Sequence, residues 1–175
     1  HYPLRRQRQM CIRDRTIDLY GVCSTIKWPN DVRVNSKKIA GVLLESEITG
    51  NTIHYVVVGL GINLHLDVKQ LSPEIQSHST SLTAELGHGV DYHEFLEVLF
   101  QQFDDIYRFF REQTSKRLIE EWKKHSDTLG KTILIQTSEE TIQGTAFDID
   151  ESGFLLVRTE HGTVKKILSG DCLYF

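Results

Sequence analysis

Cysteine is scarce in this chain of 175 residues and does not occur in closely spaced pairs. Cys11, Cys23 and Cys172 are odd in number and widely spread, with no Cys-x-x-Cys. A disulfide framework needs several cysteines in even number and a zinc ribbon needs closely spaced pairs, so the sequence argues against both and favours a cytoplasmic location. The eight histidines form no His-Glu-x-x-His motif of the kind that binds catalytic zinc.

Long hydrophobic runs and an excess of basic charge are also lacking. The longest apolar stretches, such as Val56 to Leu60, fall far short of the roughly 20 residues that a membrane-spanning helix needs. The net charge of −4 provides no general basic surface for nucleic acid. The hydrophobic fraction of 39% and the charged fraction of 25% are typical of a globular protein with one main domain and at most a small second one.

Residues 1–15 differ in composition from the rest of the chain. They contain five arginines, as many as the other 160 residues together. They follow neither a helical nor a strand period. A basic arm that contacts an acidic partner would have this composition, but the segment is more typical of a disordered or non-native leader, which is the interpretation we adopt.

Strand signals dominate the next part of the chain. Two segments rich in aliphatic and β-branched residues, 39–48 and 52–59, flank the turn Thr49-Gly50-Asn51, which predicts a β-hairpin. Pro29 cannot donate to a strand ladder, so we expect the strand before it to end at Trp28. The polar stretch 66–80 predicts a surface loop.

Three helices are predicted after this loop. Ser81 is a suitable N-cap for a short helix that Gly87 would end. Asp91 and Glu94 form a capping box at the start of a longer helix, and residues 115–125 predict another. The apolar residues of the two longer helices recur at spacings of three and four, which indicates packing against a sheet. These residues are Phe95, Leu99, Phe103, Ile106, Phe109, Phe110, Leu118, Ile119 and Trp122.

Short strands replace helices after Gly130. Segments 133–135, 141–147, 154–157 and 164–168 are apolar and are separated by polar, glycine-containing turns. Four or five short strands at this spacing predict a small closed barrel. A unit of this size barely suffices for an independent core, so we expect it to dock on the preceding domain.

Three motifs combine lysines, carboxamides, a carboxylate and glycines. They are Lys27-Trp28-Pro29-Asn30-Asp31, Lys38-Ile39-Ala40-Gly41-Val42-Leu43 and Gly59-Leu60-Gly61-Ile62-Asn63. Lysine neutralises anionic oxygens and aspartate can hold Mg²⁺, so the first two motifs suit a phosphate-bearing substrate with its cation. In this order and approximate spacing the three motifs resemble the catalytic core of biotin protein ligases. The chain after Trp122 resembles the C-terminal SH3-like barrel of the same family.

This resemblance implies an α+β fold and a particular reaction. Residues 16–127 would form part of a mixed β-sheet catalytic core with packed helices, class II synthetase-like and truncated at its N-terminus, and residues 128–175 an SH3-like β-barrel. The enzyme would activate biotin with ATP and Mg²⁺ to biotinyl-5′-AMP. It would then transfer biotin to a lysine of the biotin carboxyl carrier protein of acetyl-CoA carboxylase. The family resemblance leaves a homodimer open.

The resemblance also implies which residues carry the chemistry. Lys38 would be the catalytic residue, reaching the biotin carboxylate and the phosphoryl oxygen of biotinyl-AMP. Gly41, Gly59 and Gly61 would bind biotin and the adenylate, since glycine lets a ligand approach the backbone. A solvent-facing strand lysine is the alternative for Lys38.

Four residues match the nucleotide side of the family's site. These are Lys27, Asn30, Asp31 and Asn63, with Asp31 also the expected Mg²⁺ ligand. Each has a simpler alternative, because Asn30-Asp31 and Asn63 suit ordinary turns and Lys27 suits an edge strand.

One departure from the family pattern limits these expectations. In the family, a glycine- and arginine-rich loop that closes over biotin and phosphate precedes the position of Lys27 by several dozen residues. This loop is absent from the sequence, and so is the family's optional DNA-binding domain. The chain therefore resembles the C-terminal portion of a ligase. Two alternatives remain: an inactive fragment that serves as a binding module for a partner's edge strand, and a lipoate-type acyl ligase. The string from Lys27 to Asp31 and the C-terminal barrel disfavour the latter.

Overall fold

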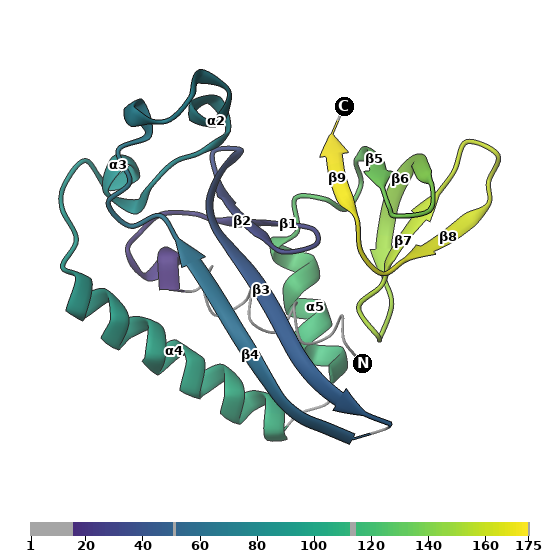
Figure 1. Ribbon diagram of the computed structural model, residues 1–175, viewed down its shortest axis with the longest axis horizontal. Helices are drawn as coiled ribbons and strands as arrows, with labels where there is room; N and C mark the ends of the chain where they lie inside the picture. The colour runs from purple at the N-terminus through teal and green to yellow at the C-terminus, as the bar shows by residue number, and fades with distance from the viewer. Residues whose placement is uncertain (1–15, 51, 113–114, 175) are drawn as a thin grey trace.

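Two antiparallel sheets organise the chain, which the computed structural model describes over residues 16–50, 52–112 and 115–174 (Figure 1). The first sheet has the order β1-β2-β3-β4 and the second β8-β7-β6-β5-β9. The first sheet comprises β1 (Thr25–Lys27), β2 (Asp31–Val34), β3 (Lys37–Thr49) and β4 (Thr52–Ile62). The 3₁₀ helix η1 (Val68–Gln70) and the helices α2 (Pro73–His78), α3 (Leu82–Leu86), α4 (Tyr92–Glu112) and α5 (Ser115–His125) follow. The second sheet comprises β5 (Thr132–Gln136), β6 (Thr141–Ile149), β7 (Leu155–Arg158), β8 (Val164–Ile167) and β9 (Asp171–Tyr174). The predicted α+β class is confirmed.

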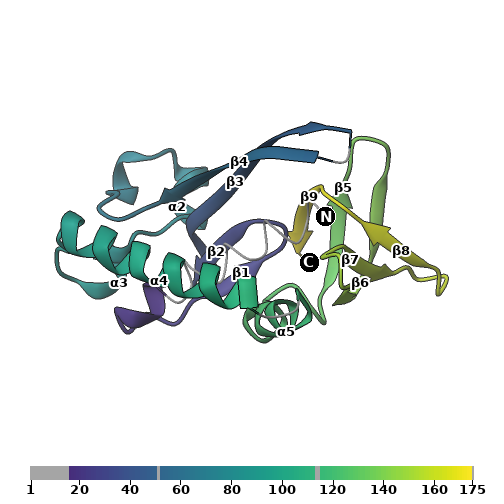
Figure 2. The same cartoon turned by 90° about the horizontal axis from the view of Figure 1, so that it is seen from below.

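The predicted hairpin is the long pair β3–β4, and its two faces differ. Ala40, Val42 and Leu44 are buried, whereas the alternating Leu43 and Val57 are more than half exposed. Figure 2 shows α4 running along one side of this hairpin while the other side is uncovered. We call the uncovered side of the first sheet the open face, and the side that α4 covers the closed face.

The predicted helix ends are confirmed by their hydrogen bonds. Ser81 Oγ accepts from the N–H of Ala84 at 3.3 Å, and Gly87 ends α3 with φ of 74°. Asp91 Oδ1 accepts from the N–H of Glu94 at 2.9 Å at the start of α4. These caps satisfy N–H groups that have no partner within the helix.

The segment predicted as a loop, 66–80, contains the short helices η1 and α2, so this prediction is wrong in part. Pro73 occupies the first turn of α2, where its missing N–H costs no hydrogen bond, and Gln76 donates its N–H to the carbonyl of Ser72 at 2.9 Å. None of the residues in these two helices is buried. Helices of one or two turns without a buried stripe leave no periodic signal in the sequence.

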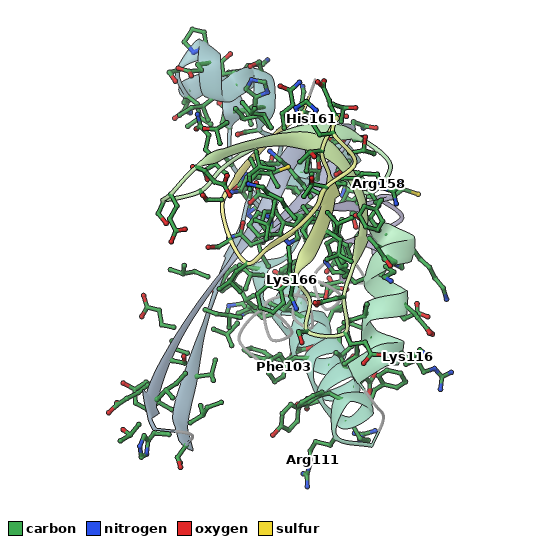
Figure 3. The ribbon with its side chains drawn as sticks, turned by 90° about the vertical axis from the view of Figure 1, so that its right-hand side faces the viewer. Phe103, Arg111, Lys116, Arg158, His161 and Lys166 are labelled. Atoms are coloured by element: carbon green, nitrogen blue, oxygen red, sulfur yellow. The ribbon has the colours of Figure 1, made fainter. Side chains whose placement is uncertain are left out.

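The second sheet contains the four predicted strands and a fifth, β9, that pairs with β5. Its only buried residue is Cys172, so its four residues carry little hydrophobic pattern. The five strands form one antiparallel ladder with β8 and β9 at its ends, and closure into an SH3-like barrel remains a prediction. In Figure 3, Arg158, His161 and Lys166 mark this sheet and its β7–β8 loop, while Arg111 and Lys116 mark the neighbouring ends of α4 and α5.

Two tryptophans are buried in the core. Trp28 and Trp122 are 1% and 0% exposed. The segment after α5 runs parallel to β1, where Ile26 bridges Ser126 and its carbonyl accepts a hydrogen bond from the N–H of Asp127 at 2.9 Å. No helix among the described residues is long and apolar enough to cross a membrane. The leader predicted for residues 1–15 and Asn51 of the predicted turn lie outside the described residues.

Candidate functional site

The strand register of the first sheet aligns four of the predicted site residues in one row. Lys27 pairs with Asp31, Asp31 with Gly41, and Gly41 with Gly61, across β1, β2, β3 and β4. Directly opposed residues on neighbouring strands project to the same side of a sheet. The row lies on the open face, because the residues next to it along each strand, such as Val42, are buried on the closed face.

A β-bulge brings Lys38 to this row. Val32 pairs with Ala40 but Arg33 pairs with Lys38, so β3 carries one extra residue, Ile39, at this point. Strict alternation would have placed Lys38 on the closed face with Ala40, and the extra residue moves it to the open face. Ile39 and Ala40 are consecutive apolar residues and both are buried, which interrupts the strict alternation of a strand, as a bulge does.

Lys38 forms an ion pair on the open face. Its Nζ lies 2.6 Å from Oδ1 of Asp31, with side-chain exposures of 49% and 22%. A Cβ on Gly41 would lie only 3.3 Å from both Cε and Nζ of Lys38, so a side chain at this position would push the lysine aside. Ion pairs this exposed contribute about 0–1 kcal/mol to stability, which leaves the ammonium available to an anionic ligand.

The other two glycines of the predicted set are less crowded. A Cβ on Gly59 would meet Leu43 at 3.5 Å, and one on Gly61 would meet the Gly41 carbonyl at 3.9 Å, both ordinary contacts. The chain's own packing therefore does not require glycine at these two positions. Their effect is to leave a floor without side chains beside Lys38 and Asp31.

Asn30 and Asn63 use their side-chain N–H groups within the protein. Asn30 donates to the carbonyl of Val42 at 2.9 Å and accepts from the N–H of Val42 at 3.0 Å through its own carbonyl. Asn63 donates to the carbonyl of Thr80 at 3.0 Å. Both side chains thus tie their segments to distant parts of the chain, Asn30 to β3 and Asn63 to the residues before α3.

The open face forms one wall of a groove between the two sheets, with a cavity volume of about 1040 Å³. The first sheet contributes Lys27, Asn30, Asp31 and Lys38. The second sheet contributes Gln136, Thr137, Ser138, Ser169, Gly170, Asp171, Cys172 and Leu173. The sequence reasoning assigned none of this second wall to the site, because nothing in a short barrel strand indicates which domain it will face.

A smaller hollow adjoins the groove and adds one more cation. Lys27, Asp31 and Lys38 line it together with Arg33, Glu74, Ile75, His78 and Ser79. Arg33 lies two residues after Asp31 on β2 and therefore on the same open face. The sequence reasoning missed Arg33, although its alternation with Asp31 was a usable signal.

Cys172 lines the groove but is a poor nucleophile. Burial raises the pKa of its thiol to about 11, an effect that the neighbouring Lys27 only partly offsets. At neutral pH the sulfur is therefore protonated, whereas the thiolate is the reactive form. The groove can bind and orient anions, but it offers no activated cysteine.

Metal binding would rest on few protein ligands. The described residues contain no group of three or more histidine, cysteine, aspartate or glutamate side chains that could hold a metal ion. Mg²⁺ is commonly held by one or two carboxylates together with substrate phosphates. Asp31 fits that role only together with a nucleotide.

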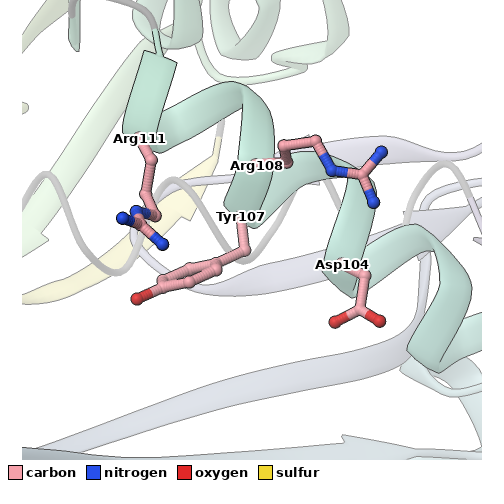
Figure 4. Close-up of a pocket in the computed structure, with 4 residues that line it drawn as sticks. All are labelled: Asp104, Tyr107, Arg108 and Arg111. Carbon is pink, nitrogen blue, oxygen red and sulfur yellow. The ribbon is translucent and has the colours of Figure 1, made fainter.

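A separate cavity of about 500 Å³ lies on α4 and shares no lining residue with the groove. Asp104, Tyr107, Arg108 and Arg111 all project from this one helix (Figure 4). One carboxylate lies among its two arginines, so the cavity has no pronounced charge of one sign.

Two segments of the chain match models of known protein families. Residues 8–63 match the model of the biotin/lipoate A/B protein ligase family, and residues 128–173 match that of the biotin protein ligase C terminal domain. Together these segments cover more than half of the sequence. The chain belongs to the biotin protein ligase family.

Curated relatives agree with this assignment. The chain is 35% identical over 145 residues to the biotin--[acetyl-CoA-carboxylase] ligase of Paracoccus denitrificans, covering 78% of this chain and 58% of that protein. It is 30% identical over 151 residues to the bifunctional ligase/repressor BirA of Bacillus subtilis, covering 86% of this chain and 46% of that protein. The chain thus spans about half the length of the curated relatives it matches.

Solved structures have the same fold. The biotin protein ligase from Aquifex aeolicus in complex with biotin and ATP superposes with a TM-score of 0.76 at 26% identity, covering 95% of this chain and 70% of that chain. The apo structure of the same ligase has a TM-score of 0.82 at 24% identity, covering 99% of this chain and 76% of that chain.

Proposed function

We propose that this chain carries the adenylate-forming site of a biotin protein ligase, which activates biotin with MgATP and transfers it to a lysine of a carboxylase carrier domain. One observation carries the proposal: Lys27, Asp31, Gly41 and Gly61 form a row with Lys38 beside it. Cations next to a floor without side chains suit a reaction that must bring two anions together, a carboxylate and a phosphate. The similarity to the Aquifex aeolicus ligase in complex with biotin and ATP supports the same proposal.

The first half-reaction joins biotin to AMP. A carboxylate oxygen of biotin attacks the α-phosphorus of ATP, and the bond from that phosphorus to its bridging oxygen breaks, so pyrophosphate leaves with the electron pair. Lys38 would turn its ammonium from Asp31 to the biotin carboxylate and the α-phosphate, lowering the repulsion between them and stabilising charge in the transition state. Gly41, Gly59 and Gly61 would bind biotin and the adenylate along the floor.

The nucleotide would lie on the side of Lys27, Asn30, Asp31 and Asn63. Lys27 adds a positive charge for the phosphates, and the amide oxygens of the two asparagines can accept from a purine amino group. Once a substrate anion occupies Lys38, Asp31 can hold Mg²⁺, which would neutralise phosphate charge when bound. The ion pair of the free protein thus keeps both groups in place for their ligands.

The second half-reaction transfers biotin to the carrier. The ε-amine of a carrier lysine attacks the acyl carbon of biotinyl-AMP, a C–N bond forms, and the C–O bond to AMP breaks, with the amine proton passing to solvent. No covalent enzyme intermediate is needed, in keeping with the protonated thiol of Cys172.

The identity of the partners belongs to the same proposal. The relatives named biotin--[acetyl-CoA-carboxylase] ligase support the biotin carboxyl carrier protein of acetyl-CoA carboxylase as the acceptor. A homodimer would have the edge strand β4 available for pairing between copies. A cytoplasmic location suits a reaction that consumes ATP and a protein without closely spaced cysteine pairs.

Biotin-dependent exchange of labelled pyrophosphate into ATP tests the first half-reaction in the full-length protein. We expect exchange with biotin and none with lipoate, which separates this function from that of a lipoate-type ligase. Calorimetric titration with biotin and with a non-hydrolysable biotinyl-AMP analogue separates it from a binding module, for which neither ligand should give heat. Absence of both exchange and heat would overturn the proposal.

A further inference from the structure

The ring of Tyr174, on the last strand of the second sheet, lies among three cations. Nζ of Lys131 is 4.3 Å from the ring centroid, Nζ of Lys27 5.1 Å and Cζ of Arg33 5.4 Å. Cations within about 6 Å of an aromatic face are attracted by its negative π surface. Two of them, Lys27 and Arg33, come from the open face of the first sheet, so this contact crosses the junction between the sheets.

The hydroxyl of Tyr174 belongs to a relay of hydrogen bonds that ends at Trp28, the residue directly after β1. Tyr174 donates to Asp127 Oδ1 at 2.5 Å, and its oxygen lies 2.8 Å from Oγ1 of Thr128. Since the tyrosine proton is used for the carboxylate, Thr128 must donate its own proton to Tyr174. Thr128 Oγ1 in turn accepts from the N–H of Trp28 at 2.9 Å, the residue next to Lys27. Burial and the bond to Asp127 raise the pKa of Tyr174, which keeps its hydroxyl a donor.

Lys27 differs from the other two cations around the ring. The Oδ2 atom of Asp127 lies 3.4 Å from Arg33 and 3.9 Å from Lys131, whereas no ion pair among the described residues involves Lys27. Lys27 is also one of the cations that line the groove. Its ammonium therefore forms no ion pair with a carboxylate of the described residues, while the Tyr174 ring lies 5.1 Å away and the hydrogen bonds from Tyr174 reach the neighbouring Trp28.

We propose that Tyr174 is a positioning residue that holds the Lys27 ammonium toward the phosphates of ATP, so that the second sheet sets the charge on the nucleotide side of the groove. The inference rests on the proposed function. Lys27 lies at the β1 end of the site row and lines the groove, and Tyr174 follows Leu173, the last residue of the second-sheet wall. A tyrosine here can orient the lysine and leave its charge in place, whereas an aspartate or glutamate would neutralise that charge.

The test uses steady-state kinetics of biotin-dependent pyrophosphate exchange in the full-length protein. Tyr174→Leu and Tyr174→Met remove the ring, and we expect the KM for ATP to rise about threefold to tenfold while the KM for biotin stays unchanged. Tyr174→Phe keeps the ring and should retain a KM for ATP close to that of the wild type. Lys131→Met is the matched control, because it removes a cation from the same ring but none from the groove, and should leave both KM values unchanged.

A double-mutant cycle with Lys27→Met gives the decisive readout. If Tyr174 acts through Lys27, Tyr174→Leu should not raise the KM for ATP further in the Lys27→Met background. Additive effects, an equal rise in the KM for biotin, an unchanged KM for ATP in Tyr174→Leu, or unfolding of both ring-deleted variants by circular dichroism would each overturn the inference. A wild-type protein without exchange would overturn the proposed function itself, and with it this inference.

Discussion

Replacement of Lys38 by alanine is the most direct test of the open face as a catalytic site. The substitution removes the ammonium that lies 2.6 Å from Asp31 and against Gly41. A unit charge at about 4 Å from charge on the α-phosphate contributes about 1 kcal/mol in water and about 4 kcal/mol at an effective dielectric constant of about 20. Since the Lys38 side chain is 49% exposed in the groove, we expect a loss of about 1.4–2.5 kcal/mol of transition-state stabilisation, which corresponds to a loss of about 10- to 70-fold in rate.

The fold should tolerate this change. Lys38 and Asp31 form a partly exposed pair that contributes about 0–1 kcal/mol, so the melting temperature should fall by only a few degrees. The assay is biotin-dependent pyrophosphate exchange in the full-length protein, with melting followed by circular dichroism. Lys37→Ala is the matched control, because Lys37 is the neighbouring exposed lysine of β3 and lines neither hollow beside Asp31.

Two results would refute the reasoning. Exchange at the wild-type rate in Lys38→Ala would show that the ammonium does not act on the reacting groups. An equal loss in Lys37→Ala would show that general positive charge, rather than the position created by the bulge, accounts for the effect.

Three further predictions concern the site, the core and the pH dependence of stability. Asp31→Asn should raise the Mg²⁺ concentration for half-maximal exchange severalfold, and an unchanged Mg²⁺ titration would contradict its role as a ligand. Trp122→Ala should lower the free energy of unfolding in urea by about 3–5 kcal/mol, whereas Trp122→Phe should cost less, because Nε1 of this fully buried indole has no partner among the described residues. Burial opposes ionisation of Asp150, but Lys166 at 2.5 Å and the N–H of Phe154 outweigh it and lower the pKa of the carboxyl below its usual value of about 3.9. The ionised Asp150 carboxylate therefore contributes its full stabilisation above about pH 4, and this stabilisation is lost as the pH falls through the lower native pKa. In urea titrations at successive pH values, Asp150→Asn should reduce the loss of stability at acid pH. An unchanged loss of stability at acid pH would contradict this.

Local signals sufficed for most elements of the fold. The alternation of 39–48 and 52–59, the caps at Ser81 and Asp91, and the apolar stripes of α4 and α5 act over a few residues, so sequence reasoning could read them directly. The helix α2 and the strand β9 escaped it because neither has a buried periodic face to leave a pattern in the sequence.

The composition of the first wall of the site was also determined by the sequence. The motifs around Lys27, Lys38 and Gly61 contain the lysines, the carboxylate and the glycines, because the proposed chemistry with two anions requires those residue types at close range. Asn30 and Asn63 show the limit of such reasoning, since an amide that suits a nucleotide suits a turn equally well.

Tertiary structure alone decided how these residues meet. The register of four strands aligns Lys27 with Gly61, 34 positions later, and the extra residue at Ile39 moves Lys38 from the closed face to the open face beside Asp31. The second wall of the groove and the contact of Tyr174 with Lys27 arise where two sheets pack together. Strand register and domain packing depend on contacts between residues distant in sequence, and no local pattern of side chains encodes them.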